Sequence, residues 1–255
     1  MGLGSRCSAE SPYHKVLPLQ QLSFTDRLRA VESRMRLAVE RAGRKRSDVK
    51  LVAVSKKFSA EAIRRAYDSG LRDFGENYVQ EFAQKQPALA DLRDARFDLI
   101  GHLQSNKARL ASQLFRVIQT VDSVKTLERL DAAATEGKRA LEILLEIKLS
   151  DEPAKTGASP EQIPDLILTA SRCRSLTLTG LMTIPPWSKD AELSRPYFQQ
   201  LAQFGQQYGL PELSMGMSDD FEVAIEEGAT IIRVGTALFG PRPKPLPAEA
   251  TPSIS

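Results

Sequence analysis

The chain alternates short apolar runs with segments of helical periodicity, and this alternation constrains its fold more than any other feature. The apolar runs cover residues 51–56, 72–76, 97–103, 117–122, 141–149, 176–184, 212–217 and 231–235. They are too continuous to keep one face in water. We therefore predict that they form parallel strands buried on both faces.

Segments with a helical spacing of apolar residues lie between these runs, and another opens the pattern at residues 23–42. The segments between the runs cover residues 59–70, 78–90, 105–115, 124–136, 160–171, 191–208 and 219–228. Such units repeated over about 200 residues fit the lower end of the size range of a closed (β/α)8 barrel. We predict an α/β fold, a single TIM barrel, with a doubly wound open sheet as the alternative.

The two ends of the chain differ in character from the part between them. Residues 1–22 show no regular pattern and are predicted to be a flexible N-terminal arm, followed by the barrel at residues 23–240. Residues 241–255 contain five prolines and are predicted to be an extended, Pro-rich C-terminal tail.

Composition excludes several classes of function. A net charge of +3 over 255 residues is too small to predict nucleic-acid binding. No apolar run approaches the ~20 residues that span a bilayer, so no membrane contact is expected. Cys7 and Cys173 stand alone without metal-site spacing, as is typical of a reducing compartment. We expect a soluble cytoplasmic protein that holds no metal.

Two adjacent lysines end the first apolar run. Barrel ligands bind at the carboxyl ends of the strands, where this run ends. Neighbouring strand residues face opposite sides, so Lys56 shares the face of Val52 and Val54, and Lys57 takes the other. Burial favours a neutral amine, which attacks aldehydes. Lys56 is the candidate amine, and the competing interpretation is a lysine whose charged end reaches solvent.

The last apolar run carries an arginine. Arg233 shares its face with Ile231 and is expected to point into the barrel, where a charge needs either a ligand or a partner. A ligand is one interpretation. The other is a buried ion pair with a carboxylate, for which Glu76 and Asp98 are the candidates.

Potential phosphate-binding groups follow the last two runs. Gly235 and Thr236 offer backbone N–H groups and a hydroxyl at the place where barrels often hold phosphate. Ser214 and Ser218 precede a predicted helix, where Ser218 can serve as an N-cap and either hydroxyl can help to bind an anion. Together with the amine of Lys56, these groups predict a pyridoxal phosphate site.

Two further residues at strand ends are weaker candidates. Asn77 follows the second run, and His102 the third. With His14 in the predicted arm, His102 has no second histidine with which to build a metal site, so we expect it to be partly buried and satisfied by its neighbours. No catalytic residue is predicted from these patterns.

Seven segments, in order and spread over residues 25–242, resemble the pyridoxal phosphate homeostasis protein family. They are Ala53-Val54-Ser55-Lys56, Phe74-Gly75-Glu76-Asn77-Tyr78-Val79-Gln80-Glu81, Ile100-Gly101-His102-Leu103-Gln104-Ser105-Asn106-Lys107, Ser150-Asp151-Glu152-Pro153, Gly180-Leu181-Met182, Leu213-Ser214-Met215-Gly216-Met217-Ser218-Asp219-Asp220 and Arg233-Val234-Gly235-Thr236-Ala237-Leu238-Phe239-Gly240. The Ser-Met-Gly-Met-Ser-Asp-Asp and Gly-Glu-Asn-Tyr blocks are the most specific.

The resemblance implies a barrel similar to the N-terminal domain of alanine racemase, with pyridoxal phosphate in aldimine linkage to Lys56. It also implies that Arg233 faces the pyridine nitrogen and that Asn77 lies close to the cofactor. By the same resemblance, the phosphate is held by Ser214, Gly235 and Thr236.

Two classes of function compete for such a site, and a barrel that binds some other phosphorylated metabolite is a third alternative. The family implies a protein of intracellular pyridoxal phosphate homeostasis without substantial amino-acid turnover, and the alternative is a racemase-like enzyme. An arginine at the ring nitrogen favours the first, because it leaves the ring a poorer electron sink. Racemisation also needs a second acid or base, for which His102 and Tyr78 are the nearby candidates. Recipient apo-enzymes are candidate partners, and a monomer is predicted.

Overall fold

A computed structural model describes residues 22–152 and 156–241 of the chain. Apart from Leu22 and Pro241, the predicted arm and tail lie outside these ranges, so their description stays a prediction. None of the described helices is both long and apolar enough to cross a bilayer.

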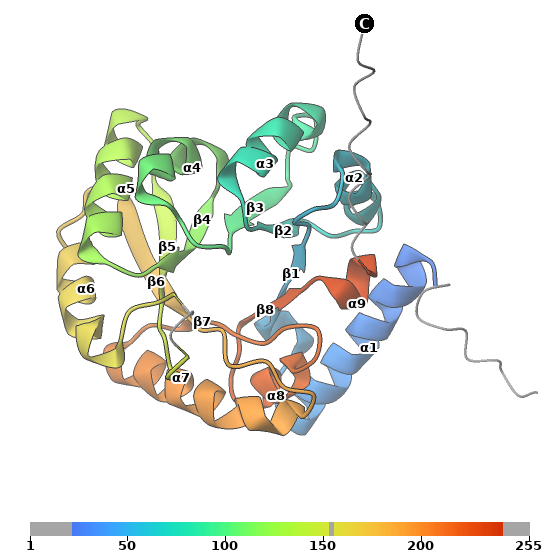
Figure 1. The fold of residues 1–255 in the computed structure, drawn as a ribbon. Coiled ribbons are helices and arrows are strands. Elements are labelled where there is room, and N and C mark those ends of the chain that lie inside the picture. Colours follow the sequence, from blue (N-terminus) through green and yellow to red (C-terminus); the bar gives the residue numbers. More distant parts are fainter. Residues whose placement is uncertain (1–21, 153–155, 242–255) are drawn as a thin grey trace, which may run out of the picture.

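Parallel strands pair in sequence order and the last pairs with the first, which closes a barrel (Figure 1). The strands are β1 (Lys50–Val54), β2 (Asp73–Glu76), β3 (Arg96–Leu99), β4 (Val117–Val121), β5 (Leu141–Glu146), β6 (Leu176–Met182), β7 (Glu212–Ser214) and β8 (Ile231–Val234). The predicted (β/α)8 barrel is confirmed, and the alternative of an open sheet is wrong.

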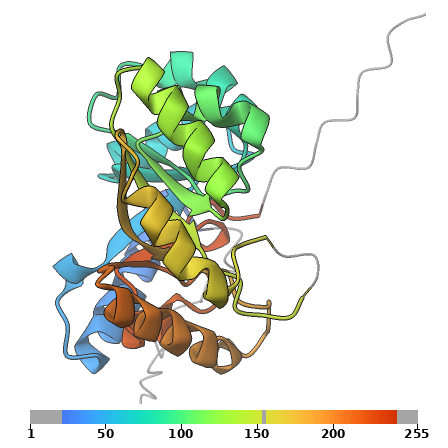
Figure 2. The same ribbon diagram turned by 90° about the vertical axis from the view of Figure 1, so that its left-hand side faces the viewer.

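Helices surround the barrel on its outside (Figures 1 and 2). The α-helices are α1 (Phe24–Arg41), α2 (Ala60–Asp68), α3 (Val79–Lys85), α4 (Ala108–Leu114), α5 (Val124–Glu136), α6 (Ile163–Ala170), α7 (Arg195–Tyr208), α8 (Phe221–Glu226) and α9 (Thr236–Phe239). Short 3₁₀ turns are η2 (Arg46–Asp48), η3 (Gln86–Leu89), η4 (Ser105–Lys107), η5 (Pro160–Gln162) and η6 (Ala191–Ser194). Ser23, Ser59 and Ser123 cap helices α1, α2 and α5, because their hydroxyls accept otherwise unpaired N–H groups.

Two apolar clusters stabilise the barrel. The smaller one comprises Val52, Val117, Leu144, Met182 and Ile231, which point into the barrel from their strands. Residues that alternate with these belong to a much larger cluster between strands and helices. Both faces of the strands are therefore buried, as the continuous apolar runs predict.

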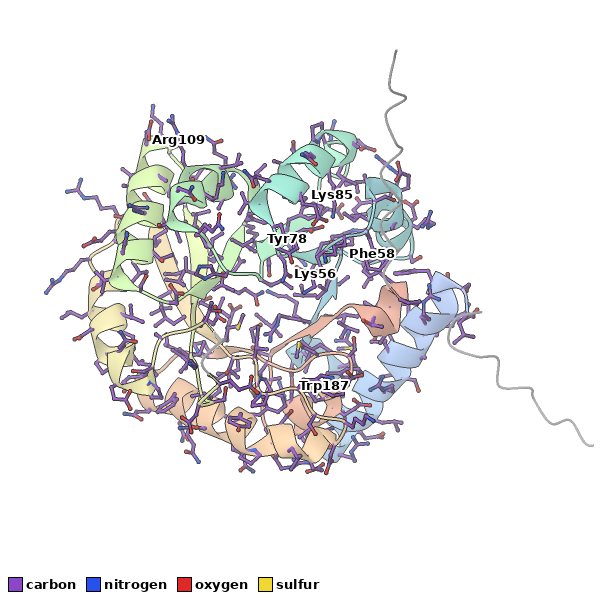
Figure 3. The ribbon with its side chains drawn as sticks, in the orientation of Figure 1. Lys56, Phe58, Tyr78, Lys85, Arg109 and Trp187 are labelled. Carbon is purple, nitrogen blue, oxygen red and sulfur yellow. The ribbon has the colours of Figure 1, made fainter. Side chains whose placement is uncertain are left out.

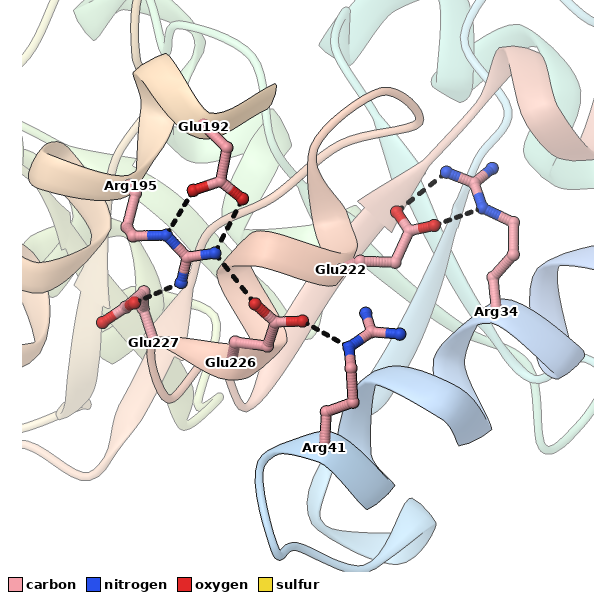
Figure 4. A network of polar contacts seen from close by, with 7 residues as sticks. All are labelled: Arg34, Arg41, Glu192, Arg195, Glu222, Glu226 and Glu227. Atoms are coloured by element: carbon pink, nitrogen blue, oxygen red, sulfur yellow. Dashed lines mark hydrogen bonds and ion pairs between the residues drawn. The ribbon is translucent and has the colours of Figure 1, made fainter. Parts of the chain in front are cut away.

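Helix α1 precedes the first strand and packs against α8 and α9. Arg34 on α1 makes a two-pronged ion pair with Glu222 on α8. A second group of ion pairs joins α1, η6, α7 and α8 (Figure 4). Its members are Arg41, Glu192, Arg195, Glu226 and Glu227. These contacts attach α1 beside the last barrel unit.

The ladder ends earlier than the apolar pattern at two strands that bear on the site. Strand β1 ends at Val54 rather than at residue 56, and β7 ends at Ser214 rather than at residue 217. Met215 is nevertheless buried in the large cluster, and Met217 lines a pocket. Backbone hydrogen bonds to neighbouring strands continue a little further, from the Ser55 N–H to Gly75 and from the Met215 N–H to Ile231. The apolar runs therefore follow burial beyond the regular strands.

Candidate functional site

A pocket of about 210 Å³ opens beyond the carboxyl ends of β1 and β8. All but one of the predicted cofactor-binding residues line it. They are Lys56, Asn77, Ser218, Arg233, Gly235 and Thr236. Strands β1 and β8 are neighbours, with Val52 paired to Arg233, so closure of the barrel brings together two segments that are far apart in the sequence.

Lys56 lies in a tight turn rather than on a strand. The turn is closed by a hydrogen bond from the Phe58 N–H to the Ser55 carbonyl, and Lys57 adopts a left-handed backbone with φ of 64°. Lys56 is half-buried and lines the pocket, whereas Lys57 is exposed. Lys56 lines the pocket, and its role as the amine stays a prediction. The alternation argument behind that choice is wrong, because the strand ends before either lysine.

A cluster of charged side chains stabilises this turn. The Ser55 hydroxyl donates to the Glu76 carboxylate at 2.8 Å, and Lys85 on α3 donates to the same oxygen at 3.0 Å. Lys85 also pairs with Glu81, whose carboxylate accepts the Lys57 backbone N–H at 2.6 Å. Burial raises the pKa of Glu76, and Lys85 opposes that shift. The turn that carries Lys56 is thereby tied to both β2 and α3.

Arg233 points into the barrel, as predicted from the strand face that it shares with Ile231. Its guanidinium donates to the Ser214 hydroxyl at 2.6 Å and to the Thr183 carbonyl at 2.8 Å. Burial lowers the pKa of Arg233 to about 10, while the charges of Asp220 and Glu146 act in the other direction. Arg233 therefore stays charged at neutral pH.

The alternative interpretation of Arg233, a buried ion pair with Glu76 or Asp98, is wrong, because its guanidinium contacts Ser214 and Thr183 instead. Glu76 pairs with Lys85 on the helix side of the strands. Asp98 accepts a hydrogen bond from Gln119. Ser214 is fully buried and lies beneath the pocket, where it contacts Gln119 and Arg233.

The phosphate-binding candidates gather where β8 passes into α9. A side chain at Gly235 would place its Cβ 3.3 Å from the Val54 Cβ, so glycine lets the two strand ends approach closely. The Ser218 hydroxyl accepts the N–H of Ala237 in α9. Ser218 is therefore not the predicted N-cap of α8, which begins at Phe221 with Asp220 before it.

Asn77 occupies the wall formed by the loop after β2. Its side-chain oxygen is buried and has no hydrogen-bond partner in the structure. Gly101 makes room for it, because a Cβ at position 101 would lie 2.4 Å from the Asn77 carbonyl oxygen. A buried oxygen without a hydrogen-bond partner is energetically costly. A bound ligand that donates a hydrogen bond to Asn77 would remove that cost.

Aromatic and aliphatic side chains supply the rest of the pocket, and the sequence patterns miss them. Phe58, Ile100, Ile184 and Trp187 line it, and Trp187 is 70 % exposed. Figure 3 shows Lys56, Phe58 and Trp187 around the mouth of the barrel. Trp187 lies in a proline-containing loop without periodicity, so only its position after a strand could have indicated it.

His102 and Tyr78, the candidates for a second acid or base, are both outside the pocket lining. The His102 side chain is 50 % exposed, and its Nδ1 lies 3.6 Å from an Asp122 carboxylate oxygen. It is thus more exposed than predicted. Tyr78 is also 50 % exposed. Among the residues that the structure describes, no cluster of histidine, cysteine and acidic side chains could hold a metal ion.

Comparison with known proteins identifies this class of barrel. The family described as alanine racemase, N-terminal domain, matches residues 27–243. The alanine racemase of Clostridium difficile has the same fold, with a TM-score of 0.64 at 12 % identity over 86 % of this chain and 58 % of that one.

More similar proteins narrow the class. The pyridoxal phosphate homeostasis protein of Pseudomonas aeruginosa is 41 % identical over 89 % of this chain and 99 % of its own length. That of Aquifex aeolicus is 40 % identical over 87 % and 99 %. PipY of Synechococcus elongatus, solved with pyridoxal phosphate bound, has a TM-score of 0.76 at 40 % identity over 86 % of this chain and all of its own. The chain belongs to the pyridoxal phosphate homeostasis protein family.

Proposed function

We propose that this chain binds pyridoxal phosphate in the pocket at β1 and β8 and acts in pyridoxal phosphate homeostasis. The observation that carries the proposal is the convergence of Lys56, Arg233 and Thr236 on one pocket. An amine, a buried cation and a hydroxyl suit an aldehyde, a heteroaromatic ring and a phosphate respectively. PipY, which is similar over its whole length, is known with this cofactor bound.

The pocket residues fit the cofactor in polarity. Gly235 and Thr236 offer backbone N–H groups and a hydroxyl, and Ser218 adds a second hydroxyl beside them. The buried oxygen of Asn77 awaits a donor. Ser214 contributes from below by contacting Arg233. The apolar side chains leave room for an aromatic ring between these polar ends.

Each polar residue has a distinct role in this proposal. When bound, pyridoxal phosphate supplies an electrophilic aldehyde carbon and a ring that accepts electrons. Lys56 would hold the aldehyde carbon through its amine. Arg233 donates hydrogen bonds and keeps its own protons at neutral pH, so it does not protonate a ring nitrogen. Arg233 would therefore leave a ring nitrogen beside it unprotonated, which would make the cofactor a weaker electron sink.

Amino-acid turnover is expected to be insubstantial. Lys56, Asp219 and Arg233 are the titratable groups among the described residues that line the pocket. A positioned second acid or base typically contributes about 10²–10⁴-fold to a proton transfer. His102 and Tyr78 are half-exposed and lie outside the lining. We therefore propose a carrier rather than a racemase-like enzyme, acting as a cytoplasmic monomer that can supply recipient apo-enzymes.

The spectrum and the labelling site of the purified protein test the binding proposal. We expect a yellow protein in which borohydride reduction fixes the cofactor on Lys56, as peptide mapping would show. Lys57→Ala serves as the matched control and should keep both colour and label, because Lys57 is exposed. A label on Lys57 would overturn the assignment.

Deuterium exchange tests the absence of turnover. The holo-protein is incubated with L- and D-amino acids in deuterated water, and the α-proton is followed. We expect at most a stoichiometric spectral change. Sustained incorporation of deuterium that disappears in Lys56→Ala would identify an enzyme instead.

A further inference from the structure

Buried polar side chains form a line across the barrel interior beneath the pocket. Arg233 donates to Ser214 at 2.6 Å, Ser214 donates to Gln119 at 2.6 Å, and Gln119 donates to Asp98 at 2.7 Å. Their exposed fractions are 3, 0, 0 and 2 % respectively. They come from β8, β7, β4 and β3, and we call them the floor chain.

The direction of every hydrogen bond in the floor chain is fixed by its two ends. Arg233 can only donate, so the Ser214 oxygen accepts and turns its own proton toward Gln119. An ionised Asp98 can only accept, so it takes the amide N–H of Gln119. The amide orientation that satisfies Asp98 is the one whose oxygen accepts from Ser214. Each end therefore supports the geometry at the other.

Asp98 is the member of the floor chain that changes charge near neutral pH. Burial raises its pKa to about 7, opposed by the hydrogen bond from Gln119. Lys50 on β1 and Arg116, which precedes β4, also favour the ionised form, and Asp73 on β2 disfavours it. A protonated carboxyl both donates and accepts, so it no longer dictates how the amide is turned.

We infer that Asp98, Gln119 and Ser214 are positioning residues that hold the guanidinium of Arg233 at the pocket floor, with the ionised carboxylate of Asp98 fixing the direction of the chain. The inference rests on the proposed function, because pyridoxal phosphate is the ligand that the positioned guanidinium contacts. It gives Ser214 a role in cofactor binding without contact to the cofactor. Gln119 and Asp98 act on Arg233 through Ser214.

Affinity for pyridoxal phosphate is the first measurement. The only tryptophan in the sequence, Trp187, lines the pocket, so quenching of its fluorescence reports binding. Gln119→Leu keeps the approximate volume and breaks both of its hydrogen bonds. We expect the dissociation constant to rise roughly tenfold, the equivalent of one such bond to a charged group. Ser112→Ala is the control, since it removes one buried hydroxyl hydrogen bond within α4.

The pH dependence of affinity is the second measurement, and packing alone would not move it. Asp98→Asn keeps an acceptor for Gln119 but cannot ionise. In the wild type we expect affinity to improve as pH rises through about 7, and this step should vanish in Asp98→Asn. The phosphate of the cofactor titrates near pH 6 in both proteins, so it cancels in their ratio.

The outcomes distinguish failure of the floor chain from failure of the proposed function. Wild-type protein that does not bind pyridoxal phosphate at all would refute the proposed function. Wild-type binding combined with Gln119→Leu equal to Ser112→Ala would overturn the floor chain. Should Gln119→Leu fail to fold, the pH profile still decides, because a step retained in Asp98→Asn would equally overturn the inference.

Discussion

Two arginines in this molecule show opposite ways of satisfying a guanidinium. Arg195 lies outside the barrel with its side chain 27 % exposed, and it pairs with three carboxylates, those of Glu192, Glu226 and Glu227 (Figure 4). Hydrogen bonds to those carboxylates raise its pKa. Arg233 is buried among neutral partners, and burial lowers its pKa.

The difference separates a structural arginine from one that can serve a ligand. Carboxylates neutralise Arg195, so nothing is left for an anionic or electron-rich partner. Arg233 contacts a hydroxyl and a carbonyl, which satisfy its geometry while leaving its charge uncompensated at contact distance. A buried charge whose contacting partners are neutral, with the carboxylates of Asp220 and Glu146 acting from farther away, is costly and is typically retained at sites that bind something.

Replacement of Arg233 should have the largest effect on binding. Arg233→Gln removes a fixed charge from the pocket, and a charged hydrogen bond is worth roughly 1.5–3 kcal/mol. We expect pyridoxal phosphate to bind at least about tenfold more weakly, measured by equilibrium dialysis. Arg195→Gln is the matched comparison and should bind as the wild type does. Equal losses in the two variants would erase the distinction between these arginines.

Neutralising Asp98 should change the pH dependence of folding. Its pKa is raised from 3.8 to about 7, so in the window between these values the folded state binds more protons than the unfolded state. Stability therefore falls as pH rises, by up to about 1.4 kcal/mol per pH unit from this group. Urea unfolding at pH 5 and pH 8 should show Asp98→Asn gaining stability over the wild type at the higher pH. A constant difference would contradict the assigned shift.

Loss of the Thr236 hydroxyl should weaken binding by less than loss of Arg233. Thr236→Ala removes one neutral hydroxyl from the pocket, and the backbone N–H groups remain. A neutral hydrogen bond contributes about 0.5–1.5 kcal/mol. Titration by tryptophan fluorescence should place this variant between the wild type and Arg233→Gln. An effect as large as that of Arg233→Gln would mean that the hydroxyl dominates.

The outer ion pairs should matter least. Arg41→Gln breaks a single pair with Glu226, in which the arginine side chain is 54 % exposed. Exposed pairs are worth about 0.2–1 kcal/mol and are screened by salt. Thermal unfolding should show a small loss at low ionic strength that disappears in high salt, with cofactor affinity unchanged. A loss that persists in high salt would point to lost packing instead.

The barrel and the approximate place of its site follow from the sequence, because alternating runs and strand ends are local patterns. Lys56 illustrates the limit of such reasoning. It lies in the pocket lining as predicted, yet the strand on which the argument depended stops at Val54. Burial leaves a periodic pattern in a sequence, but the point at which a strand gives way to a turn does not. Trp187 is missed because its loop has no periodicity either.

The floor chain could not be predicted for a different reason. Gln119 and Ser214 come from β4 and β7, which are not neighbouring strands. Contacts across a barrel depend on its stagger and on which inward side chains meet in one layer. Strand parity can place a residue inside, but it cannot choose its partner there. For this reason the sequence left open whether Arg233 serves a ligand or pairs with a carboxylate such as Asp98, whereas the structure joins Arg233 to Asp98 through two neutral side chains.

Pairing of β1 with β8 makes the barrel closed, and the pocket straddles that seam. A ligand bound by both Lys56 and Arg233 links β1 to β8, the two strands that are farthest apart in the chain. Separating β1 from β8 would break the contacts of the ligand, so bound cofactor should stabilise the closed barrel. Hydrogen exchange should therefore slow on cofactor addition most at the amides that join β1 to β8, and least in the β4–β5 wall across the barrel.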